Sequence, residues 1–218
     1  MKPNYKKIYS IVREKFEKTQ HFRYGPFDET YYTLRVYETA KELCKHYKKA
    51  NKEIVLTAAL LHDIGKTKLK SSILFGNRFG DDQSRTEWKT HGTKSVPIAG
   101  RILNKLGHSD EFISKVSFLI ANHDQPTKGQ CIELKILVDA DLIADAGFAG
   151  FIRPFLWAGK FKRGIIESIQ YMQHKENRRF AMNKISLPYS KVLAKEKLKT
   201  ENELVKIISK DIKSDVLQ

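Results

Sequence analysis

The chain has 218 residues and a hydrophobic fraction of 41%, enough for one ordinary domain with a real core, which excludes disorder throughout. It contains no run of eighteen apolar residues, so we expect no membrane-spanning helix, and the first sixteen residues lack the apolar segment of a secretion signal. The formal net charge of +15 favours acidic partners such as phosphorylated metabolites, RNA or DNA. Because the lysines are spread along most helical segments, a general lysine excess explains this charge better than a dedicated nucleic-acid surface.

Apolar residues recur at helical spacing along nearly the whole chain, and strand patterns are almost absent. The first segment places Ile8, Val12 and Phe16 on one face. Asp28 suits the N-cap of the next helix, and a third helix is expected from about residue 53 to 64. We therefore predict an all-α fold.

The middle of the chain contains a long loop, expected between residues 68 and 90. A loop of this length inside a compact domain is more often functional than idle. Pro97 suits the first turn of the helix that follows, and Gly107 is expected to end it. Ser109 is then the expected N-cap of the helix that delivers His123 at its end.

The chain is expected to form a single domain of 1–218, with a motif-bearing core of about 28–155 and a basic helical C-terminal part of about 156–218. A helix is predicted at about 132–146, and two long basic helices at about 163–182 and 190–213.

The two cysteines, Cys44 and Cys131, lie singly in apolar stretches without metal-binding spacing. We interpret them as reduced core residues, which favours a cytoplasmic protein.

Histidines and acids interrupt the apolar faces at or near helix ends. They are His62, Asp63, His91, His123, Asp139 and Asp141. The apolar run at 58–61 leads straight into His62 and Asp63, where an unpaired buried charge would be costly. A bound metal ion is the simplest partner, because imidazole and carboxylate suit divalent Mn, Mg, Co, Ni or Zn. Adjacent helical residues point about 100° apart, so this pair can share one ion only near a helix end.

Four ordered segments resemble those of one family. They read A-A-L-L-H-D-I-G-K (58–66), H-G-T-K-S-V-P-I-A-G-R-I-L-N-K-L-G (91–107), I-A-N-H-D (120–124) and I-L-V-D-A-D-L-I-A-D-A-G-F-A-G (136–150). In order and spacing they resemble the HD-domain superfamily of metal-dependent phosphohydrolases, in particular its small bacterial and archaeal hydrolases. The resemblance implies a compact helical bundle that hydrolyses a nucleotide or related phosphate ester by attack of metal-bound hydroxide on phosphorus.

The resemblance also implies roles for individual residues. His62, Asp63 and Asp141 are the expected metal ligands, and His91 and His123 are expected to complete the shell or to contact the substrate. The expected catalytic residues are Asp63, Asp139 as the base that holds the attacking water, and Lys66, which follows H-D-I-G and is placed to bind phosphate. Arg35 is expected at the substrate or beside a carboxylate of the site.

The sequence departs from the family at the usual first ligand. The family opens with histidine in an H-x-x-R-V context, whereas this chain has Tyr32, followed by matching Arg35 and Val36. A neutral phenol is a poor ligand for these ions. Three outcomes stay open: the other ligands suffice, His21 or Asp28 replaces the histidine, or the site binds metal weakly.

Two other functions follow from these alternatives. One is an HD nuclease or phosphodiesterase that grips RNA or DNA with the basic C-terminal helices, and the other is a binding protein with an impaired metal site. The expected partners are a phosphorylated small molecule such as a nucleotide, with nucleic acid as the alternative and no membrane. The aromatic stretch 148–161 leaves an oligomer open.

Overall fold

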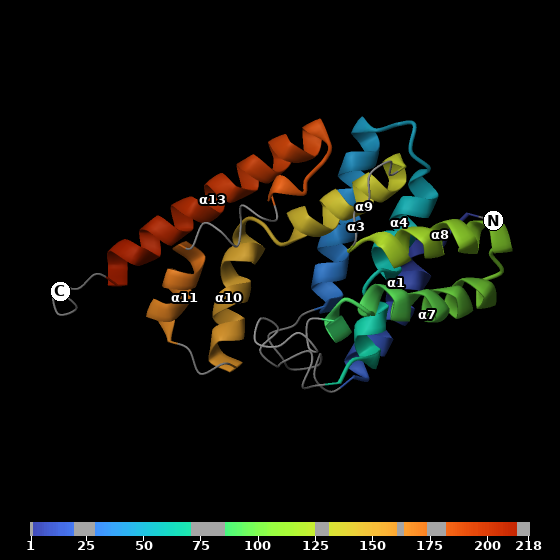
Figure 1. The fold of residues 1–218 in the computed structure, drawn as a ribbon, viewed down its shortest axis with the longest axis horizontal. Helices are drawn as coiled ribbons and strands as arrows, with labels where there is room; N and C mark the ends of the chain where they lie inside the picture. The colour runs from blue at the N-terminus through green and yellow to red at the C-terminus, as the bar shows by residue number, and fades with distance from the viewer. Residues whose placement is uncertain are drawn as a thin grey trace. The chain divides into compact units, whose positions relative to one another are not determined.

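The computed structural model of the protein describes residues 2–19, 29–70, 86–124, 131–160, 164–173 and 182–212. Within these ranges every regular element is helical, which confirms the all-α prediction (Figure 1). His21, Asp28 and most of the predicted loop after residue 70 lie outside the described residues. The chain forms two compact units, Met1–Ala140 and Asp141–Gln218. The prediction of one domain stays a prediction.

The helices of the first unit are α1 (Tyr5–Glu17), α3 (Glu29–His46), α4 (Lys52–Leu61), the 3-10 helix η1 (Ile64–Lys68), α7 (His91–Lys105) and α8 (Asp110–Asn122). Helix α9 (Ile132–Ala144) begins in this unit and contains the boundary to the second.

Helix α4 forms the centre of the first unit. All eight residues from Ile54 to Leu61 are buried, because the helix packs against α1, α3 and α8. A helix that is apolar all round belongs in a core. Its last turn therefore delivers the residues that follow, His62 and Asp63, into the interior.

Helix α7 begins earlier than the sequence predicts. It starts at His91, so Pro97 lies inside the helix, and its placement in the first turn was wrong. Packing against η1 and α8 holds the six residues before the proline in a helix, which outweighs the one N–H that proline lacks. The predicted end is confirmed, since Gly107 has a φ of 78° directly after the helix. Ser109 caps α8 as expected, accepting the N–H of Phe112.

The second unit contains α10 (Phe148–Lys160), α11 (Ile165–Gln173) and α13 (Pro188–Ile212). Ile143, Ile185 and Ala194 form a small buried core in it. The buried Glu201 of α13 accepts the N–H of Gly147 at 3.4 Å and so binds the start of α10. Helix α13 confirms the basic helix predicted at 190–213, whereas the part of the 163–182 prediction after Gln173 lies mainly outside the described residues.

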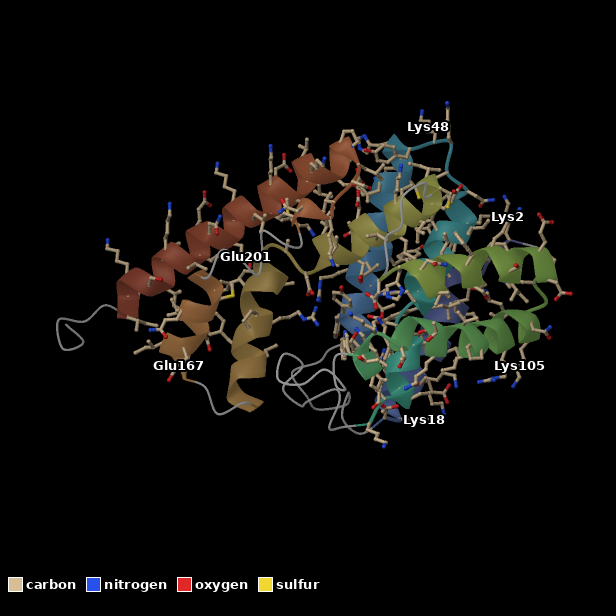
Figure 2. The ribbon with its side chains drawn as sticks, in the orientation of Figure 1. Lys2, Lys18, Lys48, Lys105, Glu167 and Glu201 are labelled. Atoms are coloured by element: carbon tan, nitrogen blue, oxygen red, sulfur yellow. The ribbon has the colours of Figure 1, made fainter. Side chains whose placement is uncertain are left out.

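The surface explains part of the composition. Lys2, Lys18, Lys48 and Lys105 are exposed and come from separate segments of the first unit, in line with a distributed lysine excess (Figure 2). None of the described helices is long and apolar enough to cross a membrane. Cys44 is buried as predicted, but Cys131 is exposed because it precedes the first turn of α9, so its assignment to the core was wrong.

Candidate metal centre

His62 and Asp63 lie where α4 ends. His62 is the C-cap with helical backbone angles, and Asp63 (φ −100°, ψ 0°) turns the chain into η1. Because the helix ends just before them, both side chains reach the same space, and His62 Nε2 lies 3.2 Å from Asp63 Oδ2. Both side chains are buried. The expectation that this pair meets only at a helix end therefore agrees with the geometry.

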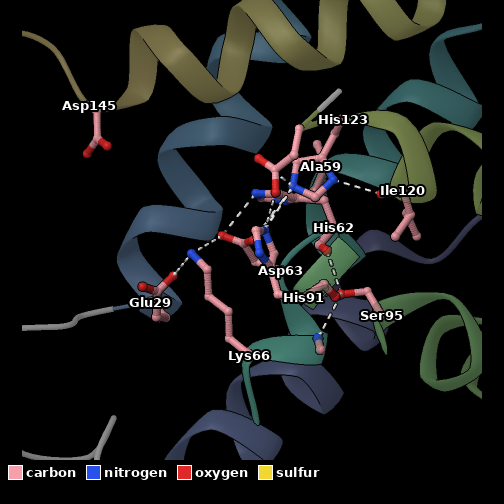
Figure 3. A network of polar contacts seen from close by, with 12 residues as sticks. Glu29, Ala59, His62, Asp63, Lys66, His91, Ser95, Ile120, His123 and Asp145 are labelled. Carbon is pink, nitrogen blue, oxygen red and sulfur yellow. Dashed lines mark hydrogen bonds and ion pairs between the residues drawn. The ribbon is translucent and has the colours of Figure 1, made fainter. Parts of the chain in front are cut away.

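Two further histidines join this pair from other elements of the first unit (Figure 3). His91 is the first residue of α7, and His123 is the C-cap of α8. The ring centroid of His123 lies 5.0 Å from that of His62 and 5.2 Å from that of His91. The Nε2 nitrogens of His91 and His123 are 3.2 Å apart. Three buried imidazoles thus meet at one point.

All three histidines are oriented in the same way. Each Nδ1 lies close to the backbone carbonyl three residues earlier, at 2.9 Å for His62, 2.7 Å for His91 and 2.7 Å for His123. The acceptors are Ala59, Trp88 and Ile120. A carbonyl only accepts hydrogen bonds, so Nδ1 must carry the proton, and in a neutral ring Nε2 keeps its lone pair. This second hydrogen bond is what orients histidine ligands in metal sites.

Asp63 presents a second oxygen to the histidines. Its Oδ1 lies 3.1 Å from His91 Nε2 and 3.8 Å from His123 Nε2. This oxygen is buried, and no described residue donates it a hydrogen bond. Apart from the ion pairs with His91 and His123, this buried oxygen has no partner among the described residues, and such a position suits a bound cation.

Asp124 is a site residue that the sequence analysis missed. Its Oδ2 lies 2.9 Å from His91 Nε2, and its Oδ1 lies 3.7 Å from His123 Nε2. The side chain is one third exposed, so it lies at the edge of the cluster. The available signal was the repetition of the His-Asp pair at the end of a second helix, after His123 as after His62.

Lys66 occupies the other oxygen of Asp63. Its Nζ lies 2.5 Å from Asp63 Oδ2 and 3.1 Å from Oε2 of Glu29, and all three residues are buried (Figure 3). The same ammonium lies 5.4 Å from the ring centroid of Tyr32 and 5.3 Å from that of Trp88. Lys66 is thus held between two carboxylates and two rings. Its predicted contact with substrate phosphate stays a prediction.

Glu29, at the start of α3, is a second residue that the sequence analysis missed. An acid at this position usually interacts with the helix dipole, and no motif marks it as part of a site. Only the fold brings it to Lys66, which lies 37 residues later.

The ion pairs shift the pKa values of the cluster. Burial raises the pKa of Asp63, but the charges of His62 and Lys66 outweigh it and hold that pKa well below its usual range. Burial lowers the pKa of His91, but interactions with Asp124 and Asp63 outweigh it and raise that pKa to about 10. Burial raises the pKa of Asp124, but His91 and His123 lower it to about 2. Without an ion, Asp63 and Asp124 are therefore ionised and His91 is protonated at neutral pH.

Tyr32 lies at the site and not on the surface. It is buried, and its ring centroid is 6.4 Å from that of His62. The guanidinium of Arg35 lies 5.4 Å from the Tyr32 ring, so the half-buried arginine is one residue away from the cluster. Its predicted contact with substrate stays a prediction.

The two acids of α9 are placed differently. Asp139 is fully buried in the first unit, as a residue of the core side of the helix. Asp141 is half-buried and is the first residue of the second unit. Their predicted roles, as base and as metal ligand, stay predictions from the motif.

The side chains present fit a divalent metal ion. Among the described residues, two groups have ligand atoms within 4.8 Å of one another: His62, Asp63 and His123, and His91, His123 and Asp124. Nitrogen and oxygen ligands of this kind suit borderline or hard ions. Oδ1 of Asp63 and the Nε2 nitrogens of the oriented histidines are both suited to bind a cation.

Comparison with known families agrees with this geometry. Residues 31–145 match the family model described as HD domain. That range contains the three histidines, Asp63 and Asp124. No curated protein matches the sequence.

Solved structures share the fold. One is a predicted HD superfamily hydrolase from an uncultured Thermotogales bacterium, with 23% identity, a TM-score of 0.64, and coverage of 96% of this chain and 93% of that chain. Another is Bacillus subtilis YpgQ in complex with ADP, with 21% identity, a TM-score of 0.67, and coverage of 97% and 99%. A third is an HD-superfamily hydrolase from Bacillus thuringiensis, with 19% identity, a TM-score of 0.64, and coverage of 95% of both chains.

Proposed function

This chain belongs to the HD domain family, and on that basis we propose that it is a metal-dependent phosphohydrolase acting on a nucleotide or a related phosphate ester. The observation that carries the proposal is the convergence of three oriented histidines on the buried carboxylate of Asp63, His62 on Oδ2 and His91 and His123 on Oδ1. The chemistry that a bound divalent ion supplies at such ligands is activation of water and neutralisation of charge on phosphoryl oxygens.

The first task of the residues is to hold the ion. In this proposal His62 and His123 bind through Nε2, and Asp63 binds through Oδ1. The Lys66 ammonium stays on Asp63 Oδ2, so the carboxylate is fixed by one oxygen and binds by the other. Since neither histidine can rotate without losing its Nδ1 hydrogen bond, the ligands are preorganised.

The second task is to bind the phosphoryl group. His91 carries a proton on Nε2 in the metal-free protein and is held by Asp124 at the exposed edge of the cluster. A protonated imidazole there can donate to a phosphoryl oxygen and offset developing charge. Asp139 holds the attacking water and accepts its proton.

Two observations support a nucleotide as the substrate. The fold relative from Bacillus subtilis was solved in complex with ADP, and the net charge of +15 favours anionic ligands. The labelled lysines of the first unit come from separate segments, which gives a nucleic-acid substrate less support.

A phosphate-release screen tests the proposal. Metal-stripped protein is loaded with Mn²⁺, Co²⁺, Ni²⁺, Mg²⁺ or Zn²⁺ and offered nucleoside mono-, di- and triphosphates, sugar phosphates and single-stranded RNA and DNA. We expect metal-dependent release from a nucleotide or phosphate ester, and loss of that release in Asp63→Ala. Cleavage of nucleic acid alone would favour a nuclease, and no turnover with any metal would leave a binding protein.

A further inference from the structure

We propose that Ser95 is a positioning residue of the metal centre: its buried hydroxyl fixes the His62–Asp63 segment against the helix that begins at His91. The inference rests on the proposed metal centre and adds a residue that contacts neither ion nor substrate.

One hydroxyl joins three backbone groups. Ser95 Oγ lies 2.7 Å from the backbone nitrogen of Gly65, 2.6 Å from the carbonyl oxygen of His62 and 2.9 Å from that of His91. The Gly65 N–H donates to the hydroxyl, and the hydroxyl hydrogen is available to the carbonyls. Ser95 is fully buried, so bulk water does not compete for these bonds.

Only two of these contacts are unusual. A serine in a helix commonly donates to the carbonyl four residues earlier, and the contact with His91 is of this kind. The contacts with His62 and Gly65 instead cross 33 and 30 residues of sequence. They hold the backbone on both sides of Asp63, at His62 and at Gly65, so they set where that carboxylate lies relative to α7.

The backbones of η1 and α7 lie in direct contact beside Ser95. A Cβ added to Gly65 would lie 2.1 Å from the His91 carbonyl oxygen and 2.5 Å from the Ser95 nitrogen. Gly92 of α7 lies near a second segment that carries a ligand, since its Cβ would lie 3.1 Å from Cε1 of His123. Helix α7 therefore contacts two segments that carry ligands, and Ser95 bonds it to one of them.

Loss of the hydroxyl would release that bond. The buried N–H of Gly65 and the carbonyl of His62 would lose their partner, and the segment would gain freedom to move away from α7. Since the ligand atoms come from both sides, a small movement spoils the distances among them. Changes outside the ligand set of this kind typically weaken metal binding by about 10- to 100-fold.

The test compares two variants with one control. Ser95→Ala removes the hydroxyl, and Ser95→Cys replaces it with a larger group that bonds weakly, so that lost volume and lost hydrogen bonds are separated. Thr93→Ala is the control, because its exposed hydroxyl bonds only Thr90 within the same turn. The measured quantity is the Mn²⁺ dissociation constant by titration calorimetry, well below the Tm of each folded variant.

We expect Ser95→Ala and Ser95→Cys each to raise the Mn²⁺ dissociation constant by about 10- to 100-fold, and Thr93→Ala to leave it unchanged. A fall in Tm with an unchanged dissociation constant would overturn the inference, because that result describes a purely structural serine. If the wild type binds Mn²⁺ but releases no phosphate, the proposed function fails while this titration still decides the role of Ser95. If the wild type binds no metal, the result contradicts both the proposed function and the role of Ser95.

Discussion

His91 Nε2 lies 2.9 Å from Asp124 Oδ2, and this contact makes the metal-free centre a proton-binding site. Interactions with Asp124 and Asp63 outweigh the effect of burial and raise the pKa of His91 to about 10. The ordinary value is 6.5, so the imidazole is neutral in most unfolded chains at pH 7.5 but protonated in the folded protein. An ion that enters the cluster must displace this proton or lie beside it.

Metal binding should therefore release a proton. At pH 7.5 and without a phosphate ligand we expect Mn²⁺ to release about one proton per chain, because the divalent charge lowers the pKa of His91. An anionic phosphoryl group that binds beside the ion favours the protonated imidazole again. Titration calorimetry in buffers of different ionisation enthalpy measures this number. His91→Gln should reduce the release, and an enthalpy that is the same in all buffers would contradict the account.

The same pKa shift affects stability of the metal-free protein. Because the pKa of His91 is higher in the folded than in the unfolded protein, its protonation stabilises the folded protein. This stabilisation is complete below the unfolded-state pKa of about 6.5 and is lost as the pH rises through the folded-state pKa of about 10. Urea unfolding of the metal-free protein should therefore show falling stability across that window. The decline should be smaller in His91→Gln, and equal declines would argue against a protonated His91.

Lys66 compensates two buried carboxylates. Lys66→Met removes the ammonium that Asp63 and Glu29 share in the interior, so we expect a loss of about 3–5 kcal/mol in the free energy of unfolding. The exposed Lys105 on α7 provides the control, and Lys105→Met should change it by less than about 0.5 kcal/mol. Denaturant titration of the metal-free proteins measures both values. Equal stabilities would mean that Lys66 is not a structural counter-ion.

Tyr32 stands where the family usually has a histidine ligand, and we expect that its phenol oxygen does not bind the ion. Tyr32→Phe removes only the phenol oxygen, and we expect the Mn²⁺ dissociation constant to stay within about threefold of the wild-type value. A much larger loss would show that the phenol binds the ion. Tyr32→His restores the usual histidine. A large gain in Mn²⁺ affinity in this variant would indicate that the metal site of the natural chain has decayed.

Gly65 is required by the contact between η1 and α7. Gly65→Ala places a methyl group 2.1 Å from a backbone oxygen, so we expect a loss of about 3 kcal/mol or more in the free energy of unfolding. Gly100 on α7 is the matched control, because its Cβ would meet only Cγ2 of Ile113 at 3.8 Å. Gly100→Ala should stabilise the helix by about 0.5–1 kcal/mol. Similar values for the two variants would contradict the close backbone packing.

The all-α fold and the family could be predicted because both depend on local patterns. Apolar spacing marked the helices, and His62, Asp63, His91 and His123 stood out as polar residues at the ends of apolar runs. The family match confirms the resemblance that these segments carried.

The missed residues are defined by contacts between distant segments. Glu29 meets Lys66 across 37 residues, and Ser95 meets His62 across 33. Neither residue type signals such a contact, because an acid at a helix start and a serine inside a helix both have ordinary local uses. The early start of α7 was missed for the same reason, since packing against η1 holds the turn before Pro97.

A titration of metal-stripped protein with Mn²⁺ tests the central claim most directly. The wild type and His46→Ala, which changes an exposed histidine paired with Glu42, should bind Mn²⁺ saturably. His62→Ala should lose most of this binding, because it removes a buried Nε2 ligand from the centre. Binding by His62→Ala that is as tight as in the wild type would contradict the account.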